Sequence, residues 1–102
     1  MTFRAEHEGL LIECENRMVQ LVKQGSPPAW KRWEVEDYQN QRNHGPRYGC
    51  GAWFGRMPAY RQMRYRRAIN DLAEDGLLTV WNEFSKLSHV QLTRKGRRRP
   101  RI

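Results

Sequence analysis

The segment Tyr60–Leu78, YRQMRYRRAINDLAEDGLL, limits most strongly what this chain can fold into. At about 100° per residue, its apolar residues gather on one side of a helix: Tyr65, Ile69, Leu72 and Ala73. Gly76 stands where a left-handed helix cap is expected, and the two leucines after it would turn back onto a core. We therefore expect a helix from Pro58 to Asp75 that packs through one face.

The charges of this helix are divided unevenly between its two halves. Four arginines and no carboxylate lie between Tyr60 and Arg67, whereas Asp71, Glu74 and Asp75 follow in the second half. Arginines so close to a helix N-terminus oppose the helix dipole and repel one another. A solvated charged surface is the structural alternative, but the arrangement favours a surface directed at an anionic partner.

The composition of the whole chain also favours an anionic partner. The chain has 102 residues, with 19 Lys and Arg against 11 Asp and Glu, which gives a formal net charge of +8. This length suits one domain, and 38% hydrophobic residues suffice for a modest core. A small, strongly basic domain points first to nucleic acid. An acidic membrane surface or an acidic protein is the weaker alternative.

The sequence predicts an intracellular protein without a membrane partner. No run approaches the roughly 18 apolar residues that cross a bilayer. The N-terminal stretch MTFRAEHEGLLIEC has carboxylates within its apolar part, unlike a signal peptide. We expect a cytoplasmic location, associated with the nucleoid if the chain binds DNA. Cys14 and Cys50 are too few for a disulfide framework, and Cys14 is most simply a small core residue.

Two helices are expected before the basic one. The apolar residues of EHEGLLIECENRMVQLVKQG recur at helical spacing: Leu10, Leu11, Cys14, Met18, Leu21 and Val22. Gly25 and the following Ser-Pro-Pro end this first helix. Ser26 can cap a second helix between Pro28 and Arg42, whose first turn accepts the prolines. A short strand over WEVEDY is the alternative.

The rest of the chain divides into a loop, a hairpin and a basic end. The loop NHGPRYGCGAWFGRMP contains four glycines and two prolines, and its aromatic residues would anchor it on the core, with a binding loop as the alternative. LTVWNEFSKLSHVQLT predicts two short strands around the turn NEFSK. The end, RKGRRRPRI, has no apolar periodicity and is expected to be disordered or weakly ordered.

In this order of elements, the chain resembles the winged helix-turn-helix family of DNA-binding domains from about Leu10 to Gly96. The specific part is RRAINDLAEDGLLTV followed, after the hairpin, by HVQLTRKG. It is similar to a recognition helix ending in Gly-Leu and a wing closing on Leu-Thr-x-x-Gly, as in transcription regulators of the multiple-antibiotic-resistance type. The resemblance implies a mainly α fold with a small β-hairpin (α+β). Residues 1–96 would form the winged-helix domain and residues 97–102 a basic tail.

The resemblance also implies a function, namely sequence-specific binding of double-stranded DNA in transcriptional regulation. The recognition helix, Pro58–Asp75, would enter the major groove, and the wing, Thr79–Leu92, would touch backbone or minor groove. Arginine forks bind phosphates or guanine edges, and the tail would add nonspecific backbone contacts. The predicted DNA contacts are Tyr60, Arg61, Arg64, Arg66, Arg67, Lys86, His89, Arg97, Arg98 and Arg99. An ordinary strand surface residue is the alternative for His89.

Two features depart from the family pattern. A long Gly-rich insert replaces the tight turn before the recognition helix, and GPRYGCGAWFG is a candidate second contact surface. Many such regulators continue after Leu-Thr-x-x-Gly into a long dimerisation helix, and we expect none in this chain. A homodimer would therefore have to use the first helix or the aromatic loop.

Neither catalysis nor a metal or other cofactor is expected. The histidines and cysteines lack the tight spacing of a zinc site, and no nucleophile–base motif stands out. Two functions remain as alternatives to DNA binding. One is an RNA-binding or ribosome-associated basic domain. The other is a protein-interaction module anchored on Trp30, Trp33 and Trp53.

Overall fold

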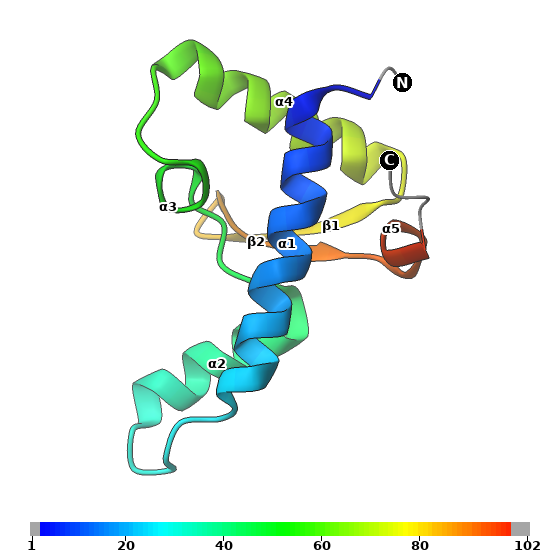
Figure 1. Ribbon diagram of the computed structural model, residues 1–102. Coiled ribbons are helices and arrows are strands. Elements are labelled where there is room, and N and C mark those ends of the chain that lie inside the picture. The colour runs from blue at the N-terminus through cyan, green and yellow to red at the C-terminus, as the bar shows by residue number, and fades with distance from the viewer. Residues whose placement is uncertain (1–2, 99–102) are drawn as a thin grey trace.

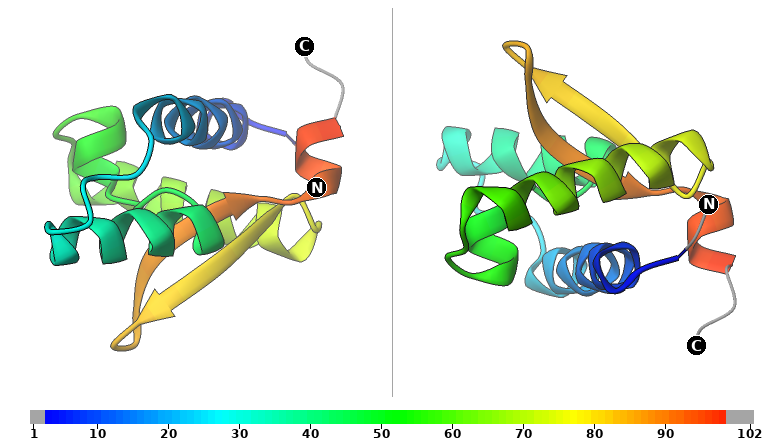
Figure 2. Two further views of the ribbon diagram at one scale, coloured as in Figure 1. Left: turned by 90° about the horizontal axis from the view of Figure 1, so that it is seen from below. Right: turned by 90° about the horizontal axis from the view of Figure 1, so that it is seen from above.

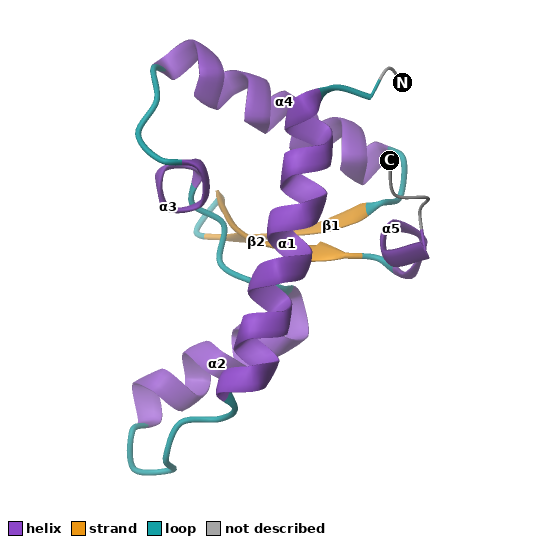
Figure 3. Cartoon of the chain, in the orientation of Figure 1, coloured by secondary structure: helices purple, strands orange, loops and turns teal. Residues whose placement is uncertain are grey.

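The computed structural model describes residues 3–98, which form five helices and one antiparallel hairpin (Figures 1 and 3). The elements in chain order are α1 (Ala5–Gln24), α2 (Arg32–His44), α3 (Cys50–Phe54), α4 (Ala59–Glu74), β1 (Leu78–Glu83), β2 (Lys86–Leu92) and α5 (Arg94–Arg98). The fold is mainly helical with a small hairpin, so the predicted α+β class is confirmed at this level.

The core lies where α1, the second half of α4 and the hairpin meet. Its buried members are Leu10, Leu11, Cys14, Trp53, Ala68, Ile69, Leu72, Leu77, Leu78, Val90 and Leu92. The predicted basic helix is confirmed, because Pro58 and Asp75 flank its two ends. The cap is confirmed as well, since Gly76 has a φ of 75° and both following leucines are buried. Cys14 is a core residue, as predicted.

α1 ends before Gly25, as its sequence predicts, but its core-facing line is narrower than expected. The residues buried along it are His7, Leu10, Leu11, Cys14 and Leu21. Val22 was predicted to belong to this line but is largely exposed, and Met18 is only partly buried. The apolar residues of α1 therefore extend around the helix, beyond the face that the core covers.

α2 begins later than predicted and contributes no buried residue. The prediction that Ser26 caps it is wrong, because Gly25–Lys31 is irregular and the Ser26 hydroxyl donates to the carbonyl of Pro27 instead. Its first helical residue is Arg32, so the two prolines lie in the loop. The alternative of a strand over WEVEDY is also wrong, because this segment is helical.

The segment between α2 and α4 is partly regular. Its aromatic residues pack on the core, as predicted, and the Trp53 Nε1 donates to the carbonyl of Arg47 at 2.9 Å. The expectation of a loop throughout is wrong, since Cys50–Phe54 forms α3 and Arg47 makes an isolated β-bridge with His89. Trp53 packs edge-on against Tyr48, with ring centroids 5.0 Å apart. Aromatic packing thus holds this segment despite its glycines.

The hairpin predicted from Thr79 to Leu92 is confirmed, and it begins one residue earlier, at Leu78. Leu78 pairs with Leu92 and Val80 with Val90, and the register shifts between Trp81 and Asn82. Phe84 and Ser85 form the turn with φ values of 52° and 63°. Two residues with positive φ are typical of the tight turns that match the twist of paired strands.

The basic end is more ordered than predicted as far as residue 98. Arg94–Arg98 forms the short helix α5, so the expectation of disorder is wrong for these residues. The expected boundary after Gly96 falls inside this helix. The rest of the predicted tail, residues 99–102, lies outside the described residues.

A set of hydrogen bonds closes the base of the hairpin. The Thr93 N–H donates to the carbonyl of Leu77 at 3.1 Å, and the Thr93 hydroxyl donates to the carbonyl of Gly76. The Gly96 N–H in turn donates to the Thr93 hydroxyl oxygen at 3.0 Å. Gly96 is buried against the Leu77 carbonyl, so a side chain there would collide with backbone. This contact gives a physical reason for the sequence Leu-Thr-x-x-Gly.

We predict that Gly96→Ala lowers the free energy of unfolding by about 1–3 kcal/mol, the usual cost of overpacking. The control is Gly51→Ala in α3, where an added Cβ meets no atom within 4 Å. The control should be neutral or slightly stabilising, because alanine lowers the entropy of the unfolded chain. Urea denaturation followed by circular dichroism measures both, and equal effects would contradict the tight contact at Gly96.

Candidate nucleic-acid interface

The first half of α4 is uncovered. From Ala59 to Arg67 every residue is exposed except Tyr65, which stacks on Phe54 with ring centroids 4.3 Å apart. The buried residues of α4 all lie in its second half, from Ala68 onward. Figure 1 shows the first half extending past α1 at the top of the molecule. One end of α4 is therefore fixed in the core while the other projects into solvent.

Three of the four predicted arginines of α4 have no ion-pair partner in the described part of the chain. Arg61, Arg66 and Arg67 are exposed and form no ion pair with any carboxylate of residues 3–98. Tyr60 is also exposed at the start of the helix. At helical spacing, Arg67 lies on the side opposite the buried residues, and Arg66 lies at the border of that side. These side chains can reach an anionic partner without breaking a contact within the protein.

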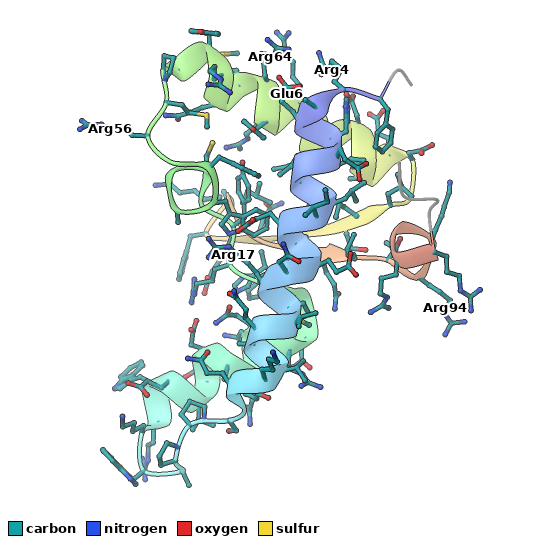
Figure 4. The ribbon with its side chains drawn as sticks, in the orientation of Figure 1. Arg4, Glu6, Arg17, Arg56, Arg64 and Arg94 are labelled. Carbon is teal, nitrogen blue, oxygen red and sulfur yellow. The ribbon has the colours of Figure 1, made fainter. Side chains whose placement is uncertain are left out.

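The fourth arginine, Arg64, is turned toward α1. Its Nε donates to the Glu6 Oε1 at 2.8 Å, and the Glu6 side chain is only 13% exposed (Figure 4). Arg64 itself remains about half exposed. Arg64, one of the predicted DNA contacts, therefore lies at the edge of the uncovered surface with its charge partly compensated.

A hydrogen-bonded histidine holds the start of α1 against the middle of α4. His7 is fully buried, and its Nδ1 accepts a bond from the Arg4 N–H at 2.9 Å. The ring therefore carries a proton at Nε2, which donates to Asp71 Oδ2 at 3.0 Å. The sequence does not predict this contact between His7 and Asp71. Sequence spacing within α4 carries no signal for a partner on another helix.

The hairpin places Lys86 where it was predicted. Lys86 begins β2 beside the turn and is exposed, as are Phe84 and Ser85. Figure 2 shows the tip of the hairpin projecting on the side of the molecule away from α1. A flexible cation at this tip can reach a surface beyond the body of the protein.

The prediction that His89 contacts DNA is wrong, and so is the alternative of an ordinary surface residue. His89 is fully buried. Val90 and Leu92 face the core, so in an alternating strand His89 would point to the opposite side of β2. The opposite side of β2 is also covered, because the end of α2 packs there with His44 stacked on Trp81 at 4.1 Å. The His89 Nδ1 is hydrogen-bonded to the Ser88 hydroxyl at 2.8 Å, while the His89 Nε2 has no partner among residues 3–98.

The predicted contacts at the C-terminal end do not join the arginines of α4. Arg97 and Arg98 are exposed on α5, which lies near the end of α4 opposite to its arginines in both views of Figure 2. Arg99 lies outside the described residues. Arg97 and Arg98 therefore form a separate basic area, together with Arg94, which points outward in Figure 4.

Two further exposed residues lie by the uncovered half of α4. Arg56 precedes the helix and points away from the molecule in Figure 4. Asn70 is exposed one turn after Arg66 and Arg67. The helical spacing of α4 places Asn70 on its outward side and could have predicted its exposure. Arg56 could be identified from the sequence only by its charge.

Other kinds of site find little support in the part of the chain that is described. Within residues 3–98, no three potential ligands are grouped to hold a metal ion, and no helix there is long and apolar enough to cross a membrane. Burial raises the pKa of the Cys14 thiol to about 12, and its Sγ donates to the Val90 carbonyl. This cysteine is a protonated core residue at neutral pH.

Comparison of the chain with known protein families, with curated proteins and with solved structures gave no match. The function is therefore argued from the arrangement of the chain's own residues.

We predict that His89 makes the fold sensitive to mild acid. Burial, and next the positive charge of Arg47, lower the pKa of His89 below its ordinary value. Between the lowered pKa and the ordinary value of about 6.5, the unfolded chain binds more protons than the folded one. The free energy of unfolding should therefore fall as the pH drops below about 6.5, until the pH lies below the folded-state pKa.

Urea denaturation at a series of pH values measures this loss. The variant His89→Gln has no titrating ring at this position, so its stability should change less across the same range. An identical pH slope in the variant and the wild-type protein would show that His89 is not the responsible group.

Proposed function

We propose that this chain is a winged-helix domain that binds double-stranded DNA in a sequence-specific manner and acts in transcriptional regulation. In this mode, the first half of α4 enters the major groove and the hairpin is the wing. One observation carries the proposal. The half of α4 that holds Arg61, Arg66 and Arg67 is uncovered, while its other half is buried in the core.

The dimensions and the charge of α4 support this proposal. The major groove is about 12 Å wide, which admits a helix with its side chains. Among residues 3–98 no side chain caps the N-terminus of α4, and its first residues, Ala59 and Tyr60, are exposed. The partial positive charge of this helix end is therefore accessible to an anion. Phosphates are the anions that such a helix end binds well.

The positions of the side chains suggest which of them would contact bases and which would contact phosphates. Arg67 and Asn70 lie on the outward side of α4, and arginine and asparagine are the side chains that pair best with guanine and adenine edges. Arg66 borders this side, and Arg61 is exposed near the start of the helix on the side of Tyr65. Both suit phosphates, as Lys86 does from the hairpin. Arg64 would contact a phosphate at the edge of the uncovered surface while its guanidinium remains paired with Glu6.

RNA is the alternative partner, because the same charges would attract it. The major groove of an RNA duplex is deep and narrow, so a helix cannot enter it. A projecting helix with arginines on its outward side therefore favours DNA over duplex RNA.

We predict that Arg67→Ala weakens binding to a preferred DNA duplex by about 1–3 kcal/mol and relaxes the sequence preference at one position. The duplex comes from selection on a randomised pool, and fluorescence anisotropy measures its affinity with duplex RNA as competitor. The control is Arg32→Ala, which removes the same charge from the exposed start of α2. Equal losses for the two variants, or equal affinity for DNA and RNA, would contradict readout of the major groove by α4.

A protein-interaction module is the second candidate, and two exposed tryptophans favour it. Trp30 and Trp33 are 78% and 86% exposed beside the start of α2, with Lys31 and Arg32 between them. Large apolar side chains left in water often mark a binding surface. Trp53, the third expected anchor, is buried in the core and is not available to a partner.

We predict that two tryptophan substitutions differ strongly in their effect on the free energy of unfolding. Trp53→Ala should lower the free energy of unfolding by about 3–5 kcal/mol, because it leaves a cavity in the core. Trp33→Ala should leave stability within about 0.5 kcal/mol, as is usual for an exposed residue. Thermal denaturation compares the two variants. A large loss of stability for Trp33→Ala would indicate that this tryptophan serves the fold rather than a partner.

A further inference from the structure

Three arginines share one side of the short helix α5. Arg97 and Arg98 follow Arg94 by three and four residues, a spacing that places side chains on the same face of a helix. All three are exposed, whereas Gly96 lies on the other side, buried against the Leu77 carbonyl. None of the three forms an ion pair with a carboxylate of residues 3–98. We call Arg94, Arg97 and Arg98 the α5 arginine face.

The opposite side of α5 attaches the helix to the rest of the fold. The Gly96 N–H donates to the Thr93 hydroxyl oxygen at 3.0 Å, which joins α5 to the end of β2. The Lys95 Nζ donates to the carbonyl of Asp75 at 2.7 Å, which joins α5 to the end of α4. Because these contacts use Lys95 and Gly96, the arginines on the other side can bind a partner without breaking them.

The composition of α5 indicates which kind of partner would bind there. Apart from Gly96, the helix consists of arginine and lysine only. Protein interfaces are centred on buried aromatic or aliphatic anchors, and a helix that lies in a membrane surface has an apolar side, whereas α5 has neither. Of the three arginines, only Arg97 borders the apolar hollow of about 420 Å³ beside α1. A planar guanidinium can bind a phosphate through two N–H groups, so a phosphate backbone fits this face best.

The α5 arginine face lies far from the uncovered half of α4. α5 is near the end of α4 opposite to its arginines in both views of Figure 2. It also follows the base of the hairpin, whereas Lys86 lies at the tip, about 20 Å away along β2. A duplex that admits the first half of α4 to its major groove and touches the tip of the hairpin would therefore lie on the other side of the molecule from α5.

We infer that the α5 arginine face binds the phosphate backbone of a second DNA duplex, so that one chain joins two duplexes. The first duplex, at α4, rests on the proposed function. The second needs no preferred sequence, because phosphate contacts carry no sequence information. The chain would thus hold a duplex of preferred sequence beside any other duplex, an activity that goes beyond the occupation of a single site.

Capture of one duplex by another tests the inference. A duplex selected for binding is immobilised on beads, and a labelled duplex of random sequence is added together with the full chain. The wild-type protein should retain the labelled duplex on the beads. Replacing all three residues of the α5 arginine face by glutamine should lower this retention about tenfold or more, because three phosphate contacts are lost. The affinity for the selected duplex alone, measured by fluorescence anisotropy, should change by less than about threefold.

The control variant loses the same amount of charge at three exposed positions away from α5 and should retain the labelled duplex as the wild-type protein does. Its substitutions are Lys23→Gln, Arg32→Gln and Arg42→Gln. Circular dichroism verifies that both variants remain folded. Equal retention by the α5 variant and the control would overturn the inference. An equal loss of affinity for both duplexes in the α5 variant would also overturn it, since α5 would then contact the first duplex.

A further variant separates failure of this inference from failure of the proposed function. With Arg61, Arg66 and Arg67 replaced by glutamine, the chain should lose its preference for the selected duplex but still bind a random duplex through α5. Adding the three α5 substitutions should abolish that binding. A wild-type chain that binds the selected duplex but retains no second one overturns the inference alone. A wild-type chain without any sequence preference, whose binding to random duplex depends on α5, overturns the proposed function and leaves the α5 site confirmed.

Discussion

The rest of the structure depends on the burial of the second half of α4 between α1 and the hairpin. Ile69 and Leu72 are almost completely buried there, and the hydrogen bonds between Gly76–Leu77 and Thr93–Gly96 fasten the strand that follows. Because this half is fixed, the first half of α4 can project without packing of its own. A short helix would be marginally stable alone in water, so the buried half supports the exposed one.

The two halves of α4 differ in the contacts that their polar groups make. Asp71 accepts a hydrogen bond from the buried His7, and the backbone carbonyl of Asp75 accepts one from Lys95. Polar groups in the second half thus serve contacts within the protein, whereas Arg61, Arg66 and Arg67 lack ion pairs to residues 3–98. Concentrating cations at the unfavourable end of the helix dipole is understandable if they serve a partner, as in the proposed DNA-binding mode.

The parts of the fold that local patterns determine could be predicted from the sequence. The helical spacing in α1 and α4, the cap at Gly76 and the two strands of the hairpin have local causes, and these elements are confirmed, although burial along the hairpin does not alternate. His89 could not be predicted, because its burial depends on the end of α2 covering the second side of the hairpin. The pairing of Arg64 with Glu6 likewise joins two helices far apart in the sequence. In the candidate interface, exposure was predictable, but partners within the protein were not.

α1 determines how α4 is presented, although it contributes none of the predicted DNA contacts. Its inner side and its start position α4, through the core, through His7 on Asp71 and through Glu6 on Arg64. Glu6 is mostly buried, so the ion pair fixes Arg64 at the edge of the uncovered surface. In the proposed mode, a substitution at Glu6 would therefore change DNA binding, although Glu6 itself need not touch DNA.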